Sequence, residues 1–199
     1  EHFNPLSPCY SQDDWLAQYA EEGQSYKQYL SLTTMRSGKF KPMTNATKTT
    51  ICLLPIGSFK SSGGAHISSD FLQKLVEYTK AFFGGVAVRL LPTLELDESA
   101  NDPRRVLVGR GIKDYSSVAG SRLTFRTHGE SGRRQLKIDS ILNTLSRIRN
   151  SKSFSMRKEC FCLVGVTMED LFDSRPDLFV AGFAFGGSKV AVFSFYRYH

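Results

Sequence analysis

The sequence lacks the short motifs that identify most catalytic centres. Its histidines (His2, His66, His128 and His199) lie far apart, with no HxH or HxxxH spacing. No GxGxxG, P-loop or GxSxG sequence is present, which argues against a nucleotide site or a serine nucleophile. A zinc site needs three or four converging ligands. The chain therefore offers no catalytic residue and no metal ligand by spacing.

Cysteine is scarce and is not arranged for metal binding. The residues Cys9, Cys52, Cys160 and Cys162 include no CxxC pair. In the apolar run CFCLVGV the two sulfurs could face one side of a strand, but cysteine is common in cores as a small hydrophobe. We therefore expect reduced, buried thiols and a cytoplasmic or nuclear location.

Long hydrophobic runs are also missing. None approaches the roughly 20 residues of a membrane span, and the first residues, EHF, do not resemble a signal peptide. We expect no membrane partner. Hydrophobic residues make up 41% and charged residues 23% of the chain, which indicates a globular protein rather than a disordered one.

Acidic residues are nearly missing from one basic segment, residues 133–158. It holds one acid, Asp139, and accounts for the net charge of +7. Its basic residues are Arg133, Arg134, Lys137, Arg147, Arg149, Lys152, Arg157 and Lys158. These charges do not share one helical face, so we favour an ordinary basic helix and loop and do not expect nucleic acid as a partner. The alternative is a surface for nucleic acid or an acidic protein.

The hydrophobic pattern predicts an arm over residues 1–47, with a short helix and a linker, and one α/β domain over residues 48–199. Expected strands are 48–59, 86–96, 160–172, 178–186 and 189–198, the last two joined by a Gly-Gly turn. Expected helices follow the first two strands, at 69–83 and 134–150, with Phe71, Leu75, Tyr78 and Phe82 of the first facing inward.

Alternation of strands and helices predicts a three-layer α/β sandwich with a mixed, mostly parallel five-stranded sheet. Right-handed crossovers give the order 2-1-3-5-4, with the fourth strand antiparallel at the edge. Residues near 97–121 look like an insert, and the segments RRVLVG and SRLTFRTH could form two short strands around its Gly- and Ser-rich part. Glu169 and Asp170 fall where the third strand ends, a common place for functional residues, but we favour a solvated acidic pair.

Several stretches together resemble eukaryotic archaemetzincins. They are ICLLPIGSF, the helix and strand DFLQKLVEYTKAFFGGVAVRLLP, FCLVGVTMEDLF, VAVFSFYRYH and the arm segment DDWLAQYAEEGQSYKQYL. The match covers nearly the whole chain apart from the insert, and the GVTMEDL and FSFYRY segments occur in the family's order.

This resemblance implies the N-terminal part of a zinc-dependent metallopeptidase of the metzincin clan. In that family the zinc-binding HExxHxxGxxH helix follows the FSFARY-type strand, so zinc and the Glu general base would lie beyond His199. We therefore expect a fragment, inactive and zinc-free by itself, whose partner is the missing catalytic part.

The resemblance also implies a substrate site, because the antiparallel edge strand of metzincins pairs with an extended peptide or protein substrate. Here that strand contains Gly182, Phe183, Ala184, Phe185 and Gly186. The competing interpretation is a weakly protected edge that another part of the protein covers. The rival function is a non-catalytic α/β interaction module that uses the basic segment.

Overall fold

The computed structural model describes residues 25–28, 48–59, 70–97, 105–108, 112–129, 132–174 and 178–198. The chain divides into two units, Glu1–Pro42 and Met43–His199. In the first, residues 26–28 form one helical turn. The Ser25 amide donates to Gln28 Oε1 (2.7 Å) and the Gln28 amide donates to Ser25 Oγ (3.2 Å), as in a capping box. The arm helix predicted over residues 11–23 lies outside the described residues, and the boundary at residue 47 stays a prediction.

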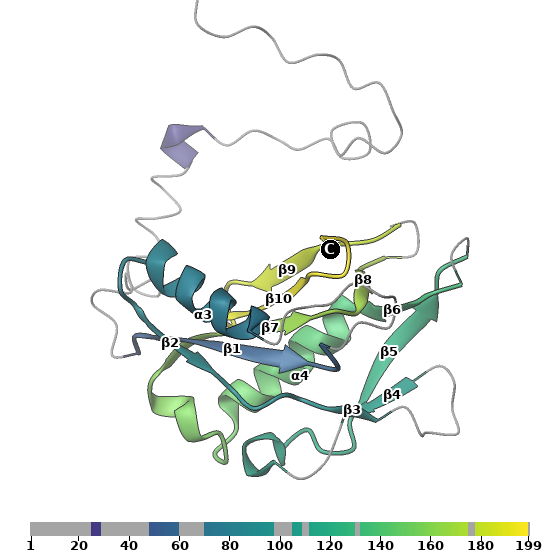
Figure 1. Cartoon of the computed structure of the whole chain (residues 1–199), viewed down its shortest axis with the longest axis horizontal. Helices are drawn as coiled ribbons and strands as arrows, with labels where there is room; N and C mark the ends of the chain where they lie inside the picture. The colour runs from purple at the N-terminus through teal and green to yellow at the C-terminus, as the bar shows by residue number, and fades with distance from the viewer. Residues whose placement is uncertain are drawn as a thin grey trace, which may run out of the picture. The chain divides into compact units, whose positions relative to one another are not determined.

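The central sheet of the second unit has the predicted neighbours (Figure 1). Its order is β2 (Ala87–Leu90), β1 (Thr50–Ile56), β7 (Cys160–Thr167), β10 (Val190–Ser194) and β9 (Gly182–Phe185). These are the second, first, third, fifth and fourth predicted strands; the labels differ because the described residues form five further strands. Only β9 runs antiparallel, paired with β10 at the edge. The predicted α/β fold class is confirmed.

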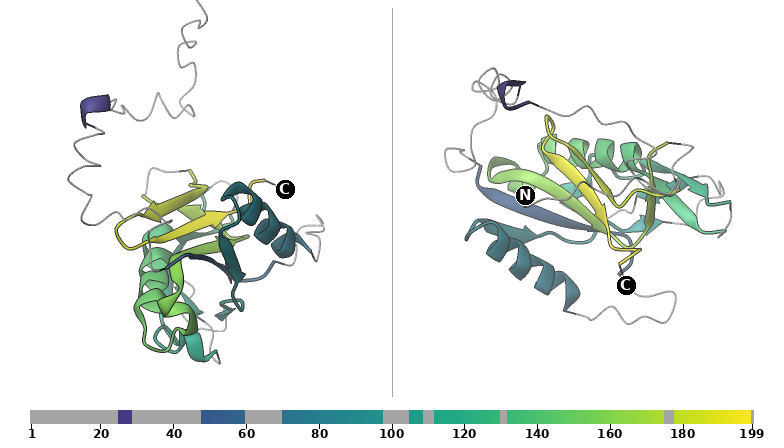
Figure 2. Two further views of the ribbon diagram at one scale, coloured as in Figure 1. Left: turned by 90° about the vertical axis from the view of Figure 1, so that its left-hand side faces the viewer. Right: turned by 90° about the horizontal axis from the view of Figure 1, so that it is seen from above.

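Two helices cover opposite faces of this sheet (Figure 2). On β1, Ile51 and Leu53 pack with Val76 of α3 (Phe71–Phe82). The alternate β1 residues Cys52, Leu54 and Ile56 pack in the larger core, with α4 (Ile138–Asn150). Since side chains alternate along a strand and both faces are covered, β1 is apolar at every position after Thr50, as in central strands of parallel sheets. All seven residues of β1 are buried.

A second five-stranded sheet was not predicted. It runs β3 (Leu96–Asp97), β4 (Arg105–Val108), β5 (Arg122–Thr127), β6 (Arg134–Lys137) and β8 (Asp170–Phe172). The short 3-10 helices η3 (Lys113–Tyr115) and η4 (Ser155–Lys158) lie between strands. The predicted insert thus contributes β4 and η3 to this layer, and Tyr115 and Val118 join the main core.

Several predicted element boundaries are wrong. The helix expected from Arg134 begins at Ile138, because Gln135 and Leu136 are buried between β5 and β8 as strand residues. The strand expected over 160–172 ends at Thr167 and resumes as β8 in the other sheet. The strand expected over 86–96 ends as β2 at Leu90, although Leu94 still forms an isolated parallel bridge with Ile56. The strands expected over 48–59, 178–186 and 189–198 are shorter, as β1, β9 and β10.

The inward face predicted for α3 is also partly wrong. Tyr78 and Phe82 are 67% and 70% exposed, and their rings stack on each other at 6.2 Å. Val76 is the one buried residue of α3, since only this part of the helix lies over β1 and β2. Within the described residues, no helix is both long and apolar enough to cross a membrane.

Gly165 of β7 tests how closely α4 packs on the sheet. A methyl group at this position would lie 2.8 Å from Ile56 Cδ1 and 3.0 Å from Leu145 Cδ1. We predict that Gly165→Ala lowers the free energy of unfolding by about 1–3 kcal/mol through overpacking. Denaturant unfolding measures this, with Gly129→Ala as control because nothing lies within 4 Å of a methyl group there. An equal effect of both variants would contradict the close packing.

Candidate functional site

The carboxyl ends of β1, β7 and β10 meet at one edge of the central sheet, where α/β proteins commonly place functional groups. Hydroxyl groups tie these strand ends together. Thr167 Oγ1 donates to the carbonyl of Ile56 (2.9 Å), and Ser194 Oγ donates to the carbonyl of Glu169 (2.6 Å). The backbone leaving β7 is thus held between its two parallel neighbours, and it delivers Glu169 and Asp170 to this edge.

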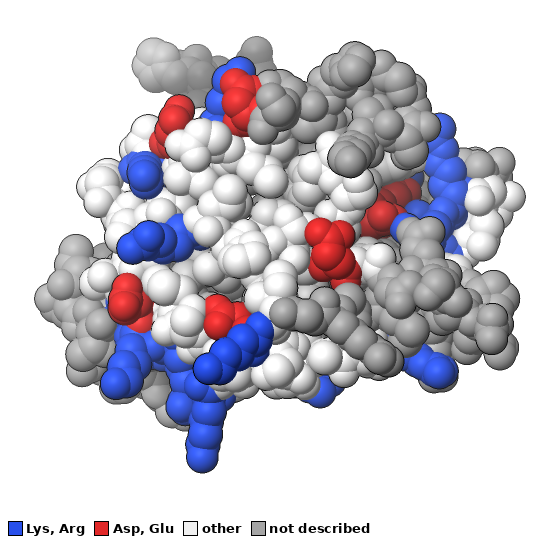
Figure 3. All heavy atoms as spheres, turned by 60° about the horizontal axis from the view of Figure 1, so that its bottom comes forward, with Lys and Arg blue, Asp and Glu red and all other residues white. Residues whose placement is uncertain are grey.

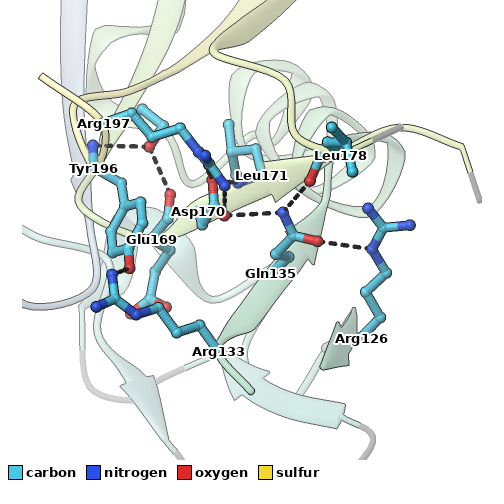
Figure 4. Close-up of polar contacts among 10 residues, drawn as sticks. Arg126, Arg133, Gln135, Glu169, Asp170, Leu171, Leu178, Tyr196 and Arg197 are labelled. Carbon is cyan, nitrogen blue, oxygen red and sulfur yellow. Dashed lines mark hydrogen bonds and ion pairs between the residues drawn. The ribbon is translucent and has the colours of Figure 1, made fainter. Parts of the chain in front are cut away.

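Asp170 is the most fully bonded acid at this edge (Figure 4). Its side chain is 4% exposed. Arg197 binds both carboxylate oxygens, with Nε–Oδ1 at 3.0 Å and Nη2–Oδ2 at 2.7 Å. Gln135 Nε2 donates to Oδ2 (2.9 Å), and the Leu171 amide donates to Oδ1 (3.2 Å). The Asp170 hydrogen bond raises the pKa of Arg197, although burial opposes this.

Gln135 extends the network into the second sheet. This side chain is fully buried in β6. Besides Asp170, its amide donates to the carbonyl of Leu178 (2.7 Å), and its Oε1 accepts from Arg126 Nε (2.8 Å). Both ends of the amide are therefore used, as buried polar groups require. The amide connects β5, β6, β8 and the segment that leads to β9.

Glu169 pairs with a different arginine. Arg134 of β6 binds it through Nη2–Oε1 at 2.9 Å and Nε–Oε2 at 3.2 Å. Arg133 donates to the Tyr196 hydroxyl, and its guanidinium also lies 5.6 Å from that ring's centroid (Figure 4). The carboxyl-end cluster, meaning Arg126, Arg134, Gln135, Glu169, Asp170 and Arg197, thus joins the two sheets to the residues that follow β10.

The predicted solvated acidic pair is therefore wrong. Asp170 is buried because β8 carries it into the second sheet, and both carboxylates are neutralised by arginine. A carboxylate with four hydrogen bonds has little capacity left to act as a base or a metal ligand. Among the described residues, no group of three or more His, Cys, Asp or Glu side chains could hold a metal ion. The cluster is built for holding segments together.

Strand β9 contains the predicted substrate-binding residues Gly182, Phe183, Ala184 and Phe185, while Gly186 lies in the following turn. It pairs with β10 alone among the described strands, so its other side is an edge. Phe183 is 46% exposed, and Phe185 packs against the main core. The structure places these residues at the predicted edge; their role in binding stays a prediction.

The hydrogen-bond phase of β9 decides which backbone groups face outward. Ser194 N donates to the carbonyl of Ala181 (2.8 Å), which makes these two a hydrogen-bonded pair. Bonded pairs alternate along an antiparallel ladder. The register Val192↔Phe183 and Val190↔Phe185 therefore turns the backbone groups of both phenylalanines toward β10. By the same alternation, those of Gly182 and Ala184 point to the open edge.

Gly182 has an additional packing role. A methyl group here would lie 2.7 Å from the Val192 carbonyl oxygen and 2.9 Å from the Phe193 ring. Gly182 is therefore needed for the packing of the hairpin, in addition to leaving the edge of β9 open.

The predicted Gly-Gly turn also differs in detail. Residues 186–189 form a four-residue turn, and its positive φ of 52° falls on Lys189 rather than on a glycine.

Cys52 and Cys160 are buried in the core as predicted and Cys162 is partly buried on the opposite face, while Cys9 lies outside the described residues. A register shift between Thr50 and Ile51 separates the β7 partners Cys160 and Cys162. Cys160 packs with Cys52 in the main core, whereas Cys162 packs on the α3 side. The hydrogen bond with Cys160, together with burial, raises the pKa of Cys52, and burial raises the pKa of Cys162 to about 11. The three described thiols are free. Cys52 and Cys162 are thus held protonated, whereas the hydrogen bond with Cys52 and the nearby charges of Arg149 and Lys48 lower the pKa of Cys160, although burial opposes this.

The basic segment 133–158 spans β6, α4 and η4. Several of its charges have intramolecular partners: Arg134 binds Glu169, and Arg147 donates to the Ser117 carbonyl (2.5 Å) and Ser121 Oγ (2.8 Å). Arg149 donates to the carbonyls of Cys160 and Phe161. This agrees with an ordinary basic helix and loop, and the alternative of an interaction module stays a prediction.

The chain is similar to curated archaemetzincins over nearly its whole length. It is 27% identical to Archaemetzincin-2 of Rattus norvegicus and 26% identical to that of Homo sapiens, each over 196 residues, or 98% of this chain. These matches cover 44% of each relative, so the chain spans less than half the length of the curated relatives it matches. No family model matches. The predicted resemblance to archaemetzincins is confirmed.

Among solved structures, the crystal structure of archaemetzincin from Methanopyrus kandleri is similar, with 23% sequence identity and a TM-score of 0.41. The match covers 77% of this chain and 61% of that one.

The buried ion pair of the carboxyl-end cluster can be tested by charge removal. We predict that Asp170→Asn lowers the free energy of unfolding by about 2 kcal/mol, below the range for fully buried pairs, because Arg197 stays partly solvated. Asp173→Asn, on a less buried neighbouring acid, should change it by under about 0.5 kcal/mol. Urea unfolding compares the two variants. Equal stability of Asp170→Asn and the parent chain would show that the pair contributes nothing.

Proposed function

We propose that this chain forms the N-terminal part of an archaemetzincin-like zinc metallopeptidase, which hydrolyses peptide bonds. The observation that carries the proposal is the similarity to curated archaemetzincins along 98% of the chain. The predicted order of the central sheet, with its antiparallel edge strand β9, supports the same conclusion. The reduced, buried cysteines fit a cytoplasmic or nuclear location, which we propose for the parent protein.

The catalytic groups would lie outside these 199 residues. An HExxHxxGxxH segment does not occur in the sequence, and the described residues contain no group of three metal-binding side chains. The residues present therefore do not fit a zinc ion. In the complete enzyme zinc would activate the attacking water, with a Glu as general base. This chain would bind the substrate and support the segment that carries the zinc ligands and the general base.

The substrate would bind as an extra strand against β9. The backbone groups of Gly182 and Ala184 face the open edge, where an extended peptide can pair with them. Ala184 is exposed and small, so the approach to its amide is open. The aromatic side chains of Phe183 and Phe185 point to the α4 side of the sheet, because they pair with core-facing Val192 and Val190. They would therefore line only one side of a bound peptide.

The contribution of the edge strand can be tested in the longer protein that carries the zinc-binding segment. We predict that Ala184→Pro reduces kcat/KM by about fivefold or more, because it removes one outward N–H donor. Zinc content and thermal stability should not change, since that N–H does not bond to β10. Ala184→Val is the control, because it adds bulk and keeps the donor. Unchanged kinetics of a folded Ala184→Pro enzyme would exclude this role.

A complementary test concerns the metal. We expect the isolated chain to hold far less than one zinc per molecule and to cleave no peptide. Addition of a polypeptide carrying the HExxHxxGxxH segment should restore one zinc per complex together with turnover. Elemental analysis after gel filtration and a fluorogenic peptide assay measure both. One tightly bound zinc in the isolated chain would overturn the proposal that the zinc ligands lie outside these 199 residues.

A further inference from the structure

The amino ends of the parallel strands carry a second charged feature, which the peptidase proposal does not use. Lys48 precedes β1, Arg149 lies in the last turn of α4, Arg157 lies in η4, and Lys189 precedes β10. Strands β1, β7 and β10 run parallel, so all three begin at one edge. Helices α4 and η4 lead directly into β7. We call these four residues the amino-end basic cluster.

Contacts around the start of β7 hold this cluster together. Thr50 N donates to the Glu159 carbonyl (3.1 Å), which places the start of β1 beside the start of β7. Arg149 Nη2 donates to the carbonyls of Phe161 (3.1 Å) and Cys160 (3.5 Å). Lys189 Nζ lies 4.5 Å from the centroid of the Phe161 ring. Arg149 and Lys189 are therefore both held against Phe161 of β7.

The described residues do not neutralise the positive charge of this cluster. Within the described part of the chain, none of its four members forms an ion pair with a carboxylate. Arg149 Nε is buried and has no acceptor there. The opposite edge of the sheet differs, because Arg134 and Arg197 are paired with Glu169 and Asp170.

Lys48 is partly buried near the other members of the cluster. Burial and the nearby charges of Arg149, Arg157 and Lys189 lower its pKa. The acid closest in sequence to the cluster, Glu159, has an exposed side chain and forms no ion pair among the described residues. An anion bound between the four cations would offset their mutual repulsion.

Figure 3 shows the setting of this edge on the surface. The parallel strands begin at the left of Figure 1. Figure 3 is turned about the horizontal axis, so this edge of the sheet is again at the left. Lys and Arg side chains lie at the left and lower left of that face with acidic side chains among them, and others lie along its right side, whereas its centre is mostly uncharged.

We propose that the amino-end basic cluster binds a compact phosphate-bearing anion. Guanidinium and ammonium groups together suit phosphate oxygens, the first through paired N–H donors and the second as a point charge. A small polyphosphate matches four cations gathered at the ends of adjacent elements. An extended nucleic acid fits less well, because base stacking needs an open ring and Lys189 already lies over Phe161.

Inorganic pyrophosphate is the probe for this site. We expect saturable binding by the whole chain in titration calorimetry, with amide shifts in NMR spectra confined to the segments around Lys48, Phe161 and Lys189. The double variant Lys48→Gln/Lys189→Gln should weaken binding by about tenfold or more, because each charged hydrogen bond is worth over 1 kcal/mol. Arg157→Gln, on an exposed side chain without hydrogen-bond partners in the described residues, should weaken it without disturbing the fold.

The control removes the same charge elsewhere. Lys74→Gln/Lys113→Gln changes two exposed lysines outside the cluster and should leave pyrophosphate affinity within about twofold, apart from long-range electrostatics. Equal losses in both double variants, or no saturable binding, would overturn the proposal. Tighter binding of a single-stranded oligonucleotide than of pyrophosphate, lost in the Lys48→Gln/Lys189→Gln variant, would also overturn it in favour of a nucleic-acid surface.

Discussion

The buried Asp170 carboxylate is the interaction on which the architecture at the carboxyl end depends. It is the point where the central sheet, the second sheet and the residues after β10 meet, through Arg197, Gln135 and the backbone of β8. A buried charge is tolerated only when its partners are held in place. The sequence positions of those partners, near 135, 170 and 197, show that this constraint links segments far apart in the chain.

The central sheet was predictable because local signals and topology agree there. The continuous apolar run of β1, the Gly-Gly hairpin and right-handed crossovers leave one arrangement. The second sheet was not predictable, because its strands are short and the pairing of β6 with β8 joins segments far apart in the chain. Arg134–Lys137 shows this well: its pattern continues the periodicity of α4, and only the burial of Gln135 against Asp170 makes it a strand.

The candidate sites were predictable to different degrees. The position of β9 at the edge followed from its hairpin, but the direction of its amides required the register with β10. Asp170 stood out in the sequence by its place after a strand, yet its burial depends on Arg197, which no local pattern connects to it. The amino-end basic cluster draws on four separate elements, and only two of its members belong to the segment that is conspicuously basic in sequence.

The order of strands in the central sheet has a consequence for synthesis on the ribosome. β9 is made before β10, yet β10 lies between β9 and β7, so β9 has no strand to pair with until β10 has emerged. Likewise β1 gains its β7 partner only after more than one hundred further residues, as the pair Thr50↔Cys160 shows. Such non-local pairing slows folding. A nascent chain would therefore leave one side of the apolar β1 unpaired for longest, which makes this strand a natural binding point for chaperones.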